Sequence, residues 1–88
     1  MKIKDGFMLR QFGDSYIVVA VGEGSEDFNK LITINEVGAF IYKFLSEDRT
    51  RDEVVSAMLE KYDVSEEIAV RDCDAYITNL KTAGLLDE

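Results

Sequence analysis

The side chains that could carry acid–base or covalent chemistry are few in this 88-residue chain. It contains no histidine, which removes the commonest general base and the favoured transition-metal ligand. Its lone cysteine, Cys73, has neither a histidine nor a second cysteine to activate it, and we interpret it as a small buried hydrophobe. The tyrosines are interpreted as packing residues with a polar tip. The sequence therefore predicts no catalytic group and no cofactor.

The acidic segment from Glu23 to Asp27 could attract a cation. It lacks the alternating Asp or Asn residues and the glycine that a calcium-binding loop places at fixed positions. We interpret it as a solvated loop, and no metal site is predicted.

The charge balance bears on the partners of the chain. With a formal net charge of −8, binding to nucleic acid or to an anionic membrane is not expected, because both are bound mainly through Lys and Arg. The longest apolar run, Tyr16 to Val21, is far shorter than the roughly 20 residues of a membrane-spanning helix, and the N-terminus does not resemble a signal peptide. The unpaired cysteine fits a reducing compartment. The sequence predicts a cytoplasmic protein.

Two apolar segments near the N-terminus predict a hairpin. Phe7 to Phe12 and Ser15 to Val21 are separated by Gly13-Asp14, a pair suited to a two-residue turn. The second segment is apolar at nearly every position, so we expect a central strand that is covered on both faces. Leu31 to Ile34 is the third predicted strand.

Three amphipathic helices are predicted after the strands, each with apolar residues at helical spacing. Asn35 can cap the first, because its side-chain oxygen can accept an N–H of the first turn. Thr50 to Glu53 forms a capping box at the start of the second. The third begins at Ser65 and ends at Gly84. We expect one α+β domain, residues 1–88, with three strands followed by three helices.

The third predicted strand could bind an extended peptide. If the second strand is central, the third is an edge whose backbone, Leu31 to Asn35, has unpaired N–H and C=O groups that can accept an added strand. Alternation places Ile32 and Ile34 on one face, where we interpret their side chains as core. Their backbone, together with that of Thr33, can still pair with a peptide.

The third predicted helix could form the other wall of a peptide groove. At about 100° per residue, a compact core stripe contains Ala69, Cys73, Tyr76, Leu80 and Ala83. One shoulder of this stripe combines apolar contacts with one acid and one base, and we predict that it contacts the peptide: Val70, Asp74, Ile77 and Lys81. Two alternatives stay open, since Val70 and Ile77 could instead widen the core stripe. The opposite shoulder could equally face the groove: Ile68, Asp72, Ala75 and Asn79.

Three motifs in this order resemble the PqqD family, whose members are also called RiPP precursor peptide recognition elements. They are the strand-to-helix junction from Ile34 to Ala39, the helix start Thr50 to Val54, and the pattern Tyr-Ile-x-x-Leu-x-x-x-Gly-Leu-Leu within Ala69 to Leu86. Members often carry a glycine just before the threonine. Here Asp48-Arg49 stands there, which is expected to change only a turn.

The resemblance implies a winged-helix-like fold, with a three-stranded antiparallel sheet packed on three helices. It implies a non-catalytic module without a cofactor, which binds the leader of a ribosomally made precursor peptide as a strand added to the third strand. It also implies presentation of that peptide to a modifying enzyme, often a radical enzyme that uses S-adenosylmethionine. Since an open edge could also pair with a second copy, a weak homodimer that the peptide dissolves is compatible with this function.

A winged-helix DNA-binding protein, or another protein-interaction module, is the main alternative. A recognition helix should carry Lys and Arg toward phosphates and base edges. The third predicted helix instead has more acids than bases, Glu66, Glu67, Asp72 and Asp74 against Arg71 and Lys81. This balance disfavours contact with DNA.

Overall fold

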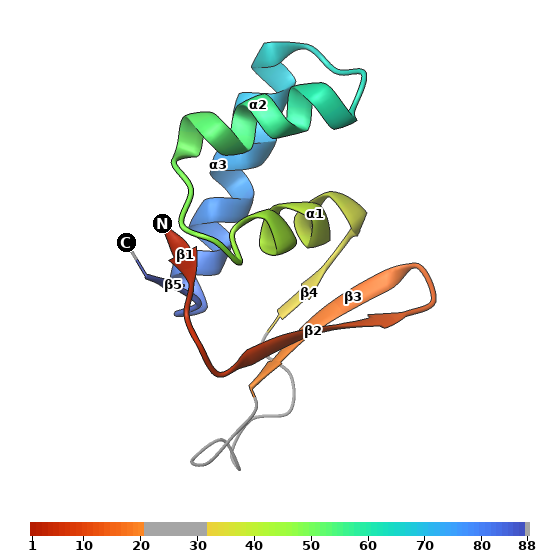
Figure 1. The fold of residues 1–88 in the computed structure, drawn as a ribbon. Helices are drawn as coiled ribbons and strands as arrows, with labels where there is room; N and C mark the ends of the chain where they lie inside the picture. Colours follow the sequence, from red (N-terminus) through yellow and green to blue (C-terminus); the bar gives the residue numbers. More distant parts are fainter. Residues whose placement is uncertain (21–31, 88) are drawn as a thin grey trace.

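The computed structural model describes residues 1–20 and 32–87, in which three helices cover one face of a three-stranded sheet (Figure 1). In chain order the elements are β1 (Lys2–Ile3), β2 (Phe7–Phe12), β3 (Ser15–Ala20), β4 (Ile32–Ile34), α1 (Glu36–Phe44), α2 (Arg51–Lys61), α3 (Glu66–Thr82) and β5 (Leu86–Asp87). The predicted α+β order of three strands followed by three helices is confirmed. Val21 and Leu31, predicted at strand ends, lie outside the described residues.

The main sheet is antiparallel with strand order β2-β3-β4, so β3 is central as predicted. Gly13 has φ 59°, a left-handed conformation that favours glycine at the hairpin turn between β2 and β3. The helices lie on one side of the sheet, where α1 contacts β3 and β4, and no described helix covers the other face of β3, so the predicted cover on both faces is not found within the described residues (Figure 1). Val18 is buried against the helices, whereas Met8 and Phe12, which lie on the other face of the sheet, are 43% and 62% exposed.

Each helix begins at the residue predicted for its start. The capping box at the start of α2 is complete, with Thr50 Oγ1 accepting from the Glu53 N–H at 3.1 Å and Glu53 Oε1 accepting from the Thr50 N–H at 2.9 Å. Ser65 Oγ accepts from the first turn of α3. At the other end of α3, Gly84 has φ 79° and the Leu85 N–H donates to the Leu80 carbonyl at 2.9 Å, a Schellman-type stop at the glycine where the helix was predicted to end.

A second, two-stranded sheet was not predicted. β1 pairs antiparallel with β5, which places Ile3 opposite Leu86 and brings the two ends of the fold together (Figure 1). The Ile3 N–H also donates to the Leu45 carbonyl at 2.8 Å. Both strands are only two residues long, so neither carries a periodic pattern that sequence analysis could detect.

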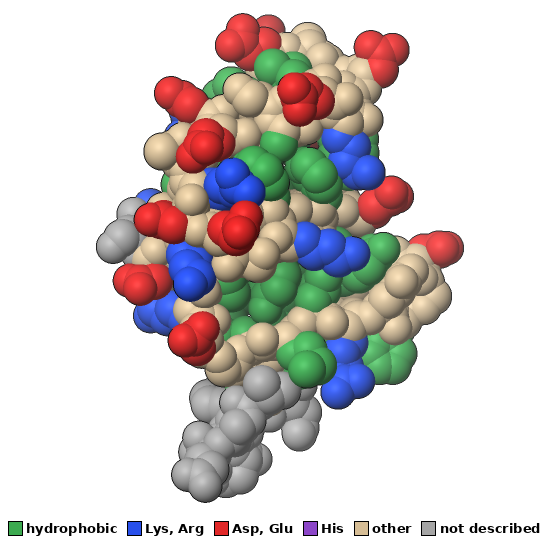
Figure 2. Space-filling model, viewed as in Figure 1, with side chains coloured by type: hydrophobic (Ala, Val, Ile, Leu, Met, Phe, Trp, Pro, Cys, Tyr) green, Lys and Arg blue, Asp and Glu red, His purple; other side chains and the backbone are tan. Residues whose placement is uncertain are grey.

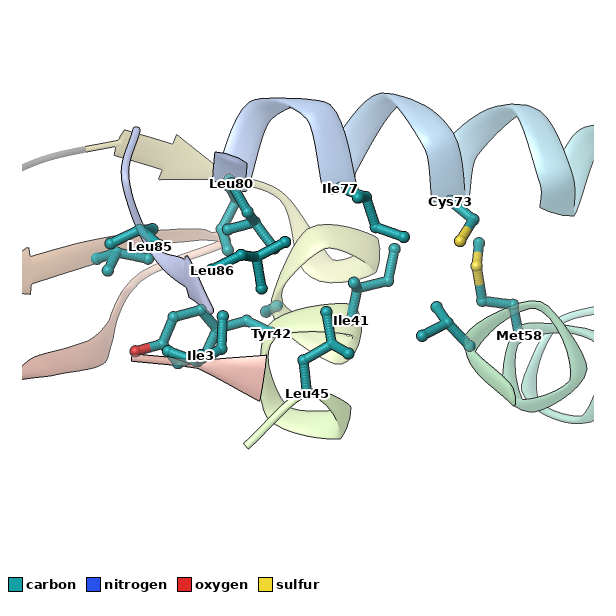
Figure 3. Close-up of a cluster of buried hydrophobic side chains, with 14 of the residues drawn as sticks. Ile3, Ile41, Tyr42, Leu45, Met58, Cys73, Ile77, Leu80, Leu85 and Leu86 are labelled. Carbon is teal, nitrogen blue, oxygen red and sulfur yellow. The ribbon is translucent and has the colours of Figure 1, made fainter. Parts of the chain in front are cut away.

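The core lies where α3 crosses α1 and α2. Figure 3 shows the side chains of Ile41, Ile77, Cys73 and Met58 converging from the three helices. Ile41 and Cys73 are 0% exposed and Ile77 only 6%. Within the described ranges, no helix has the length and apolar composition that a membrane crossing requires.

Candidate peptide-binding groove

β4 is an edge of the main sheet. It pairs with β3 through Thr33 opposite Ile17 and Ile34 opposite Tyr16, and no described strand pairs with its other side. Ile34 is buried and Thr33 exposed, as the predicted alternation requires. Alternate N–H and C=O groups of β4 therefore face outward, where an extended chain could pair with them.

A groove of about 420 Å³ separates this edge from the C-terminal half of α3. Among the described residues its lining is uncharged and consists of Ile32, Thr33, Ile34, Asn79, Thr82 and Ala83. The strand contributes backbone and aliphatic surface, while the helix contributes small polar groups and one methyl group. Such a groove can accept an extended, neutral segment of peptide without desolvating a fixed charge.

Asn35 ties β4, α1 and α3 together next to the groove. Its Oδ1 atom accepts one hydrogen bond from the Gly38 N–H at 3.0 Å and another from the Tyr76 hydroxyl at 2.5 Å. Burial raises the pKa of Tyr76, so its hydroxyl stays protonated and can donate. The predicted capping role of Asn35 is thus confirmed, and the residue also joins the strand edge to the opposite wall of the groove.

Gly38 allows the close approach at this junction. A Cβ atom added there would lie 2.7 Å from Tyr76 Cε1 and 2.9 Å from Ile34 Cβ. Both distances are shorter than real Cβ contacts, so a larger residue must displace the Tyr76 ring and Ile34 of β4. The absence of a side chain at Gly38 therefore helps to set the separation of the two groove walls.

The shoulder of α3 that was predicted to face the groove faces α2 instead. Ile77 belongs to the core, and the Asp74 carboxylate pairs with the Arg51 guanidinium of α2 at 2.5 and 2.9 Å, which lowers the pKa of Asp74. Val70 and Lys81 lie on the same side of the helix as Asp74, far around the helix from Asn79. The predicted placement beside β4 is therefore wrong for this shoulder.

The alternative shoulder, represented by Asn79, is the one that faces the groove. Ala69, Cys73 and Leu80 of the predicted core stripe are buried, and Ile77 widens that stripe, which is the alternative left open by the sequence. The exception is Tyr76, which is only partly buried. Its hydroxyl needs a polar partner and finds it in Asn35. Whether Val70 and Lys81 contact a peptide elsewhere stays a prediction.

No chemistry beyond binding is visible in the described ranges. Cys73 is buried, and burial raises the pKa of its thiol to about 11, which keeps it from acting as a thiolate near neutral pH. Among residues 1–20 and 32–87, no three side chains of the metal-binding types gather. The acidic segment from Glu23 to Asp27 lies outside the described residues.

The family model for coenzyme PQQ synthesis protein D (PqqD) matches residues 16–86. The chain belongs to the PqqD family. The match extends from the central strand β3 to the start of β5, so it includes both walls of the groove. No curated protein matches the sequence of this PqqD-family chain.

Two solved structures share the fold of this PqqD-family chain. TbiB1, in complex with the TbiA(beta) leader peptide, is 24% identical with a TM-score of 0.73, and the match covers 99% of this chain and 95% of TbiB1. A lasso peptide synthetase B1, complexed with its leader peptide, is 21% identical with a TM-score of 0.68, and the match covers 96% of this chain and 93% of that one. At these identities the likeness shows the fold.

Proposed function

We propose that this chain is a recognition module that binds the leader of a ribosomally made precursor peptide as a strand added to β4. The observation that carries the proposal is the outward edge of β4, without a described strand partner, beside an uncharged groove of about 420 Å³. Membership of the PqqD family supports it, as do two proteins of the same fold that bind leader peptides.

Both walls of the groove contribute to binding in this proposal. The described part of β4 is three residues long, or about 10 Å, which leaves room for only a few main-chain hydrogen bonds with a peptide. Each contributes about 1 kcal/mol net, so the strand alone cannot supply a tight complex. The remaining affinity and the register come from side chains of the peptide that pack against Asn79, Thr82 and Ala83.

The module acts by binding and not by catalysis in this proposal. It holds the leader while a separate modifying enzyme, often a radical S-adenosylmethionine enzyme as the family resemblance implies, acts on the rest of the precursor. The absence of histidine and the high pKa of the buried Cys73 thiol support this division of roles. The cytoplasm, where precursor peptides are synthesised, is the proposed compartment.

Amide hydrogen exchange with and without a leader peptide, taken from a short precursor gene found near this one, tests the proposal. We expect slower exchange at alternate residues from Ile32 to Asn35, with spectral changes from Asn79 to Ala83. Changes confined to β2, the opposite edge of the sheet, would contradict the assignment of the site.

A matched pair of variants tests the groove itself. Thr82→Arg places a long charged side chain in the groove, whereas Ser56→Arg adds the same charge at an exposed position of α2. The first should weaken leader binding at least ten-fold and the second should leave it within two-fold, with both proteins folded. Equal effects would show that charge, and not the groove, determines binding.

A further inference from the structure

A second hollow lies on the other side of α1. Its volume is about 210 Å³, and its walls combine three aromatic rings, two lysines and one acid: Tyr16, Phe40, Tyr62, Lys43, Lys61 and Glu36. We call it the lysine–aromatic pocket. On the face shown in Figure 2, hydrophobic side chains reach the surface in a band between the helices and the sheet, with Lys and Arg beside them.

The pocket is lined by α1, whereas the described lining of the groove comes from β4 and α3 and contains no residue of α1. Phe40 and Lys43 project from one face of the helix at helical spacing. Gly38 and Ile41 project from the other, toward α3 and the core. A partner seated in the lysine–aromatic pocket would therefore leave the groove between β4 and α3 open.

The lysines are held over the rings. Lys61 Nζ lies 5.4 Å from the centroid of Phe40 and 5.8 Å from that of Tyr62, and the two rings meet edge to face at 5.8 Å. Lys43 Nζ lies 5.8 Å from the centroid of Tyr16. These separations are within the range of cation–π attraction, so both positive charges have defined positions against an apolar floor.

The polar groups of the pocket are incompletely paired. In the described part of the chain, neither Lys43 nor Lys61 forms an ion pair with a carboxylate. The Tyr62 hydroxyl is shielded from solvent and has no hydrogen-bond partner among the same residues. Two lysines and a single acid, Glu36, among the described lining residues give the pocket a positive balance on a chain with a net charge of −8. The lysines offer a binding site for an anionic group.

We propose that the lysine–aromatic pocket docks an acidic segment of the modifying enzyme, in which an aromatic side chain stands next to Asp or Glu. The aromatic ring packs against Phe40 and Tyr62, and the carboxylates pair with Lys43 and Lys61. The overall negative charge of the chain does not prevent this, because charges more than about 8 Å apart are screened at physiological salt.

The identity of the partner rests on the proposed function, whereas the chemistry of the pocket does not. An enzyme that receives the leader must hold the module without displacing the peptide. A surface across α1 from the groove meets that requirement. An acidic segment should also prefer the pocket to the groove, since the described residues that line the groove include no Lys or Arg.

The test is a heteronuclear NMR titration of the full chain with two short probes, N-acetyl-Glu-Phe-Glu-amide and its neutral counterpart N-acetyl-Gln-Phe-Gln-amide. At millimolar concentrations the acidic probe should shift the amides of Tyr16, Phe40 and Tyr62, and it should bind several-fold tighter than the neutral probe. Signals from Thr33 and Asn79 in the groove should not move.

Neutralising the lysines provides the matched variants. Lys43→Gln and Lys61→Gln should each weaken binding of the acidic probe roughly two- to five-fold and leave the neutral probe unaffected. Lys4→Gln removes the same charge from an exposed position outside the pocket, and it should leave the binding of both probes unchanged.

Equal binding of the two probes would overturn the proposal. It would also be overturned if Lys43→Gln and Lys61→Gln did not alter the amide shifts caused by the acidic probe, or if those shifts were centred on the groove. Because the probes contain no leader sequence, these outcomes leave the proposed function standing. If the parent chain responded to the acidic probe but did not bind a leader peptide, that result would count against the proposed function alone.

Discussion

Replacing Gly38 with alanine tests whether close packing at the junction of β4, α1 and α3 shapes the groove. Helix propensity alone predicts that Gly38→Ala stabilises the protein by about 1 kcal/mol, because glycine is a poor residue inside a helix. The structure predicts the opposite sign. The new methyl group would lie 2.7 Å from Tyr76 Cε1 and 2.9 Å from Ile34 Cβ, both far inside ordinary contact distance.

The two effects can be weighed. Forcing an extra carbon into a close-packed site costs about 1–3 kcal/mol, and two contacts this short favour the upper half of that range. After subtraction of the gain in propensity, Gly38→Ala should lower the free energy of unfolding by about 1–2 kcal/mol. Relief requires Tyr76 or β4 to move, so leader binding should weaken as well.

Urea denaturation monitored by circular dichroism measures the change in the free energy of unfolding. Ser56→Ala, at an exposed position of α2, serves as the control for propensity and should stabilise the protein by about 0.5 kcal/mol. If Gly38→Ala were also more stable than the parent chain, the packing argument would be refuted. A variant that is less stable but binds the leader as well as the parent would show that the junction does not set the width of the groove.

Three further predictions concern α3 and its neighbours. Ile77→Asp should unfold the protein because it buries an unpaired carboxylate, whereas Thr78→Asp on the exposed side should not; thermal circular dichroism distinguishes them. The hydrogen bonds from the Arg51 guanidinium hold the pKa of Asp74 below the ordinary value for an aspartate, about 3.9, so this pair stabilises the fold above about pH 4. The contribution is lost as the pH falls through the folded-state pKa. Asp74→Asn should therefore reduce the loss of stability between pH 5 and pH 2 in urea titrations, and an unchanged pH profile would contradict it. Cys73 should react with an alkylating reagent at pH 8 only as fast as the protein opens, which mass spectrometry with and without urea can establish.

The parts of the fold that depend on local chemistry could be predicted from the sequence. Asn35, Thr50 and Ser65 each cap the helix that follows them, and the hairpin turn falls at Gly13 as expected. The position of β4 at the sheet edge also follows from local patterns, because the apolar character of β3 identified the central strand. In each case the deciding interaction joins residues that are close in sequence.

The orientation of α3 could not be predicted in this way. Tyr76 and Ile77 are adjacent and both apolar enough for a core, so the helical period alone accommodates either of them. The deciding interaction is the hydrogen bond from Tyr76 to Asn35, which joins residues 41 positions apart. No local pattern indicates such a pair, so the sequence left both shoulders of the core stripe open, and the shoulder that contains Asn79 is the one that lines the groove.

The ladder between β1 and β5 has a consequence for how firmly the groove is held. The last turn of a helix ordinarily frays, and here that turn carries Thr82 and Ala83 of the groove wall. Leu85 and Leu86 directly follow it, and both are buried, with Leu86 paired to Ile3. Loosening the end of α3 therefore requires the ladder to open and two leucines to leave the core. When the groove wall is already ordered, less conformational entropy is lost on binding of a peptide. The strands β1 and β5, which do not line the groove, therefore contribute to its affinity for the peptide.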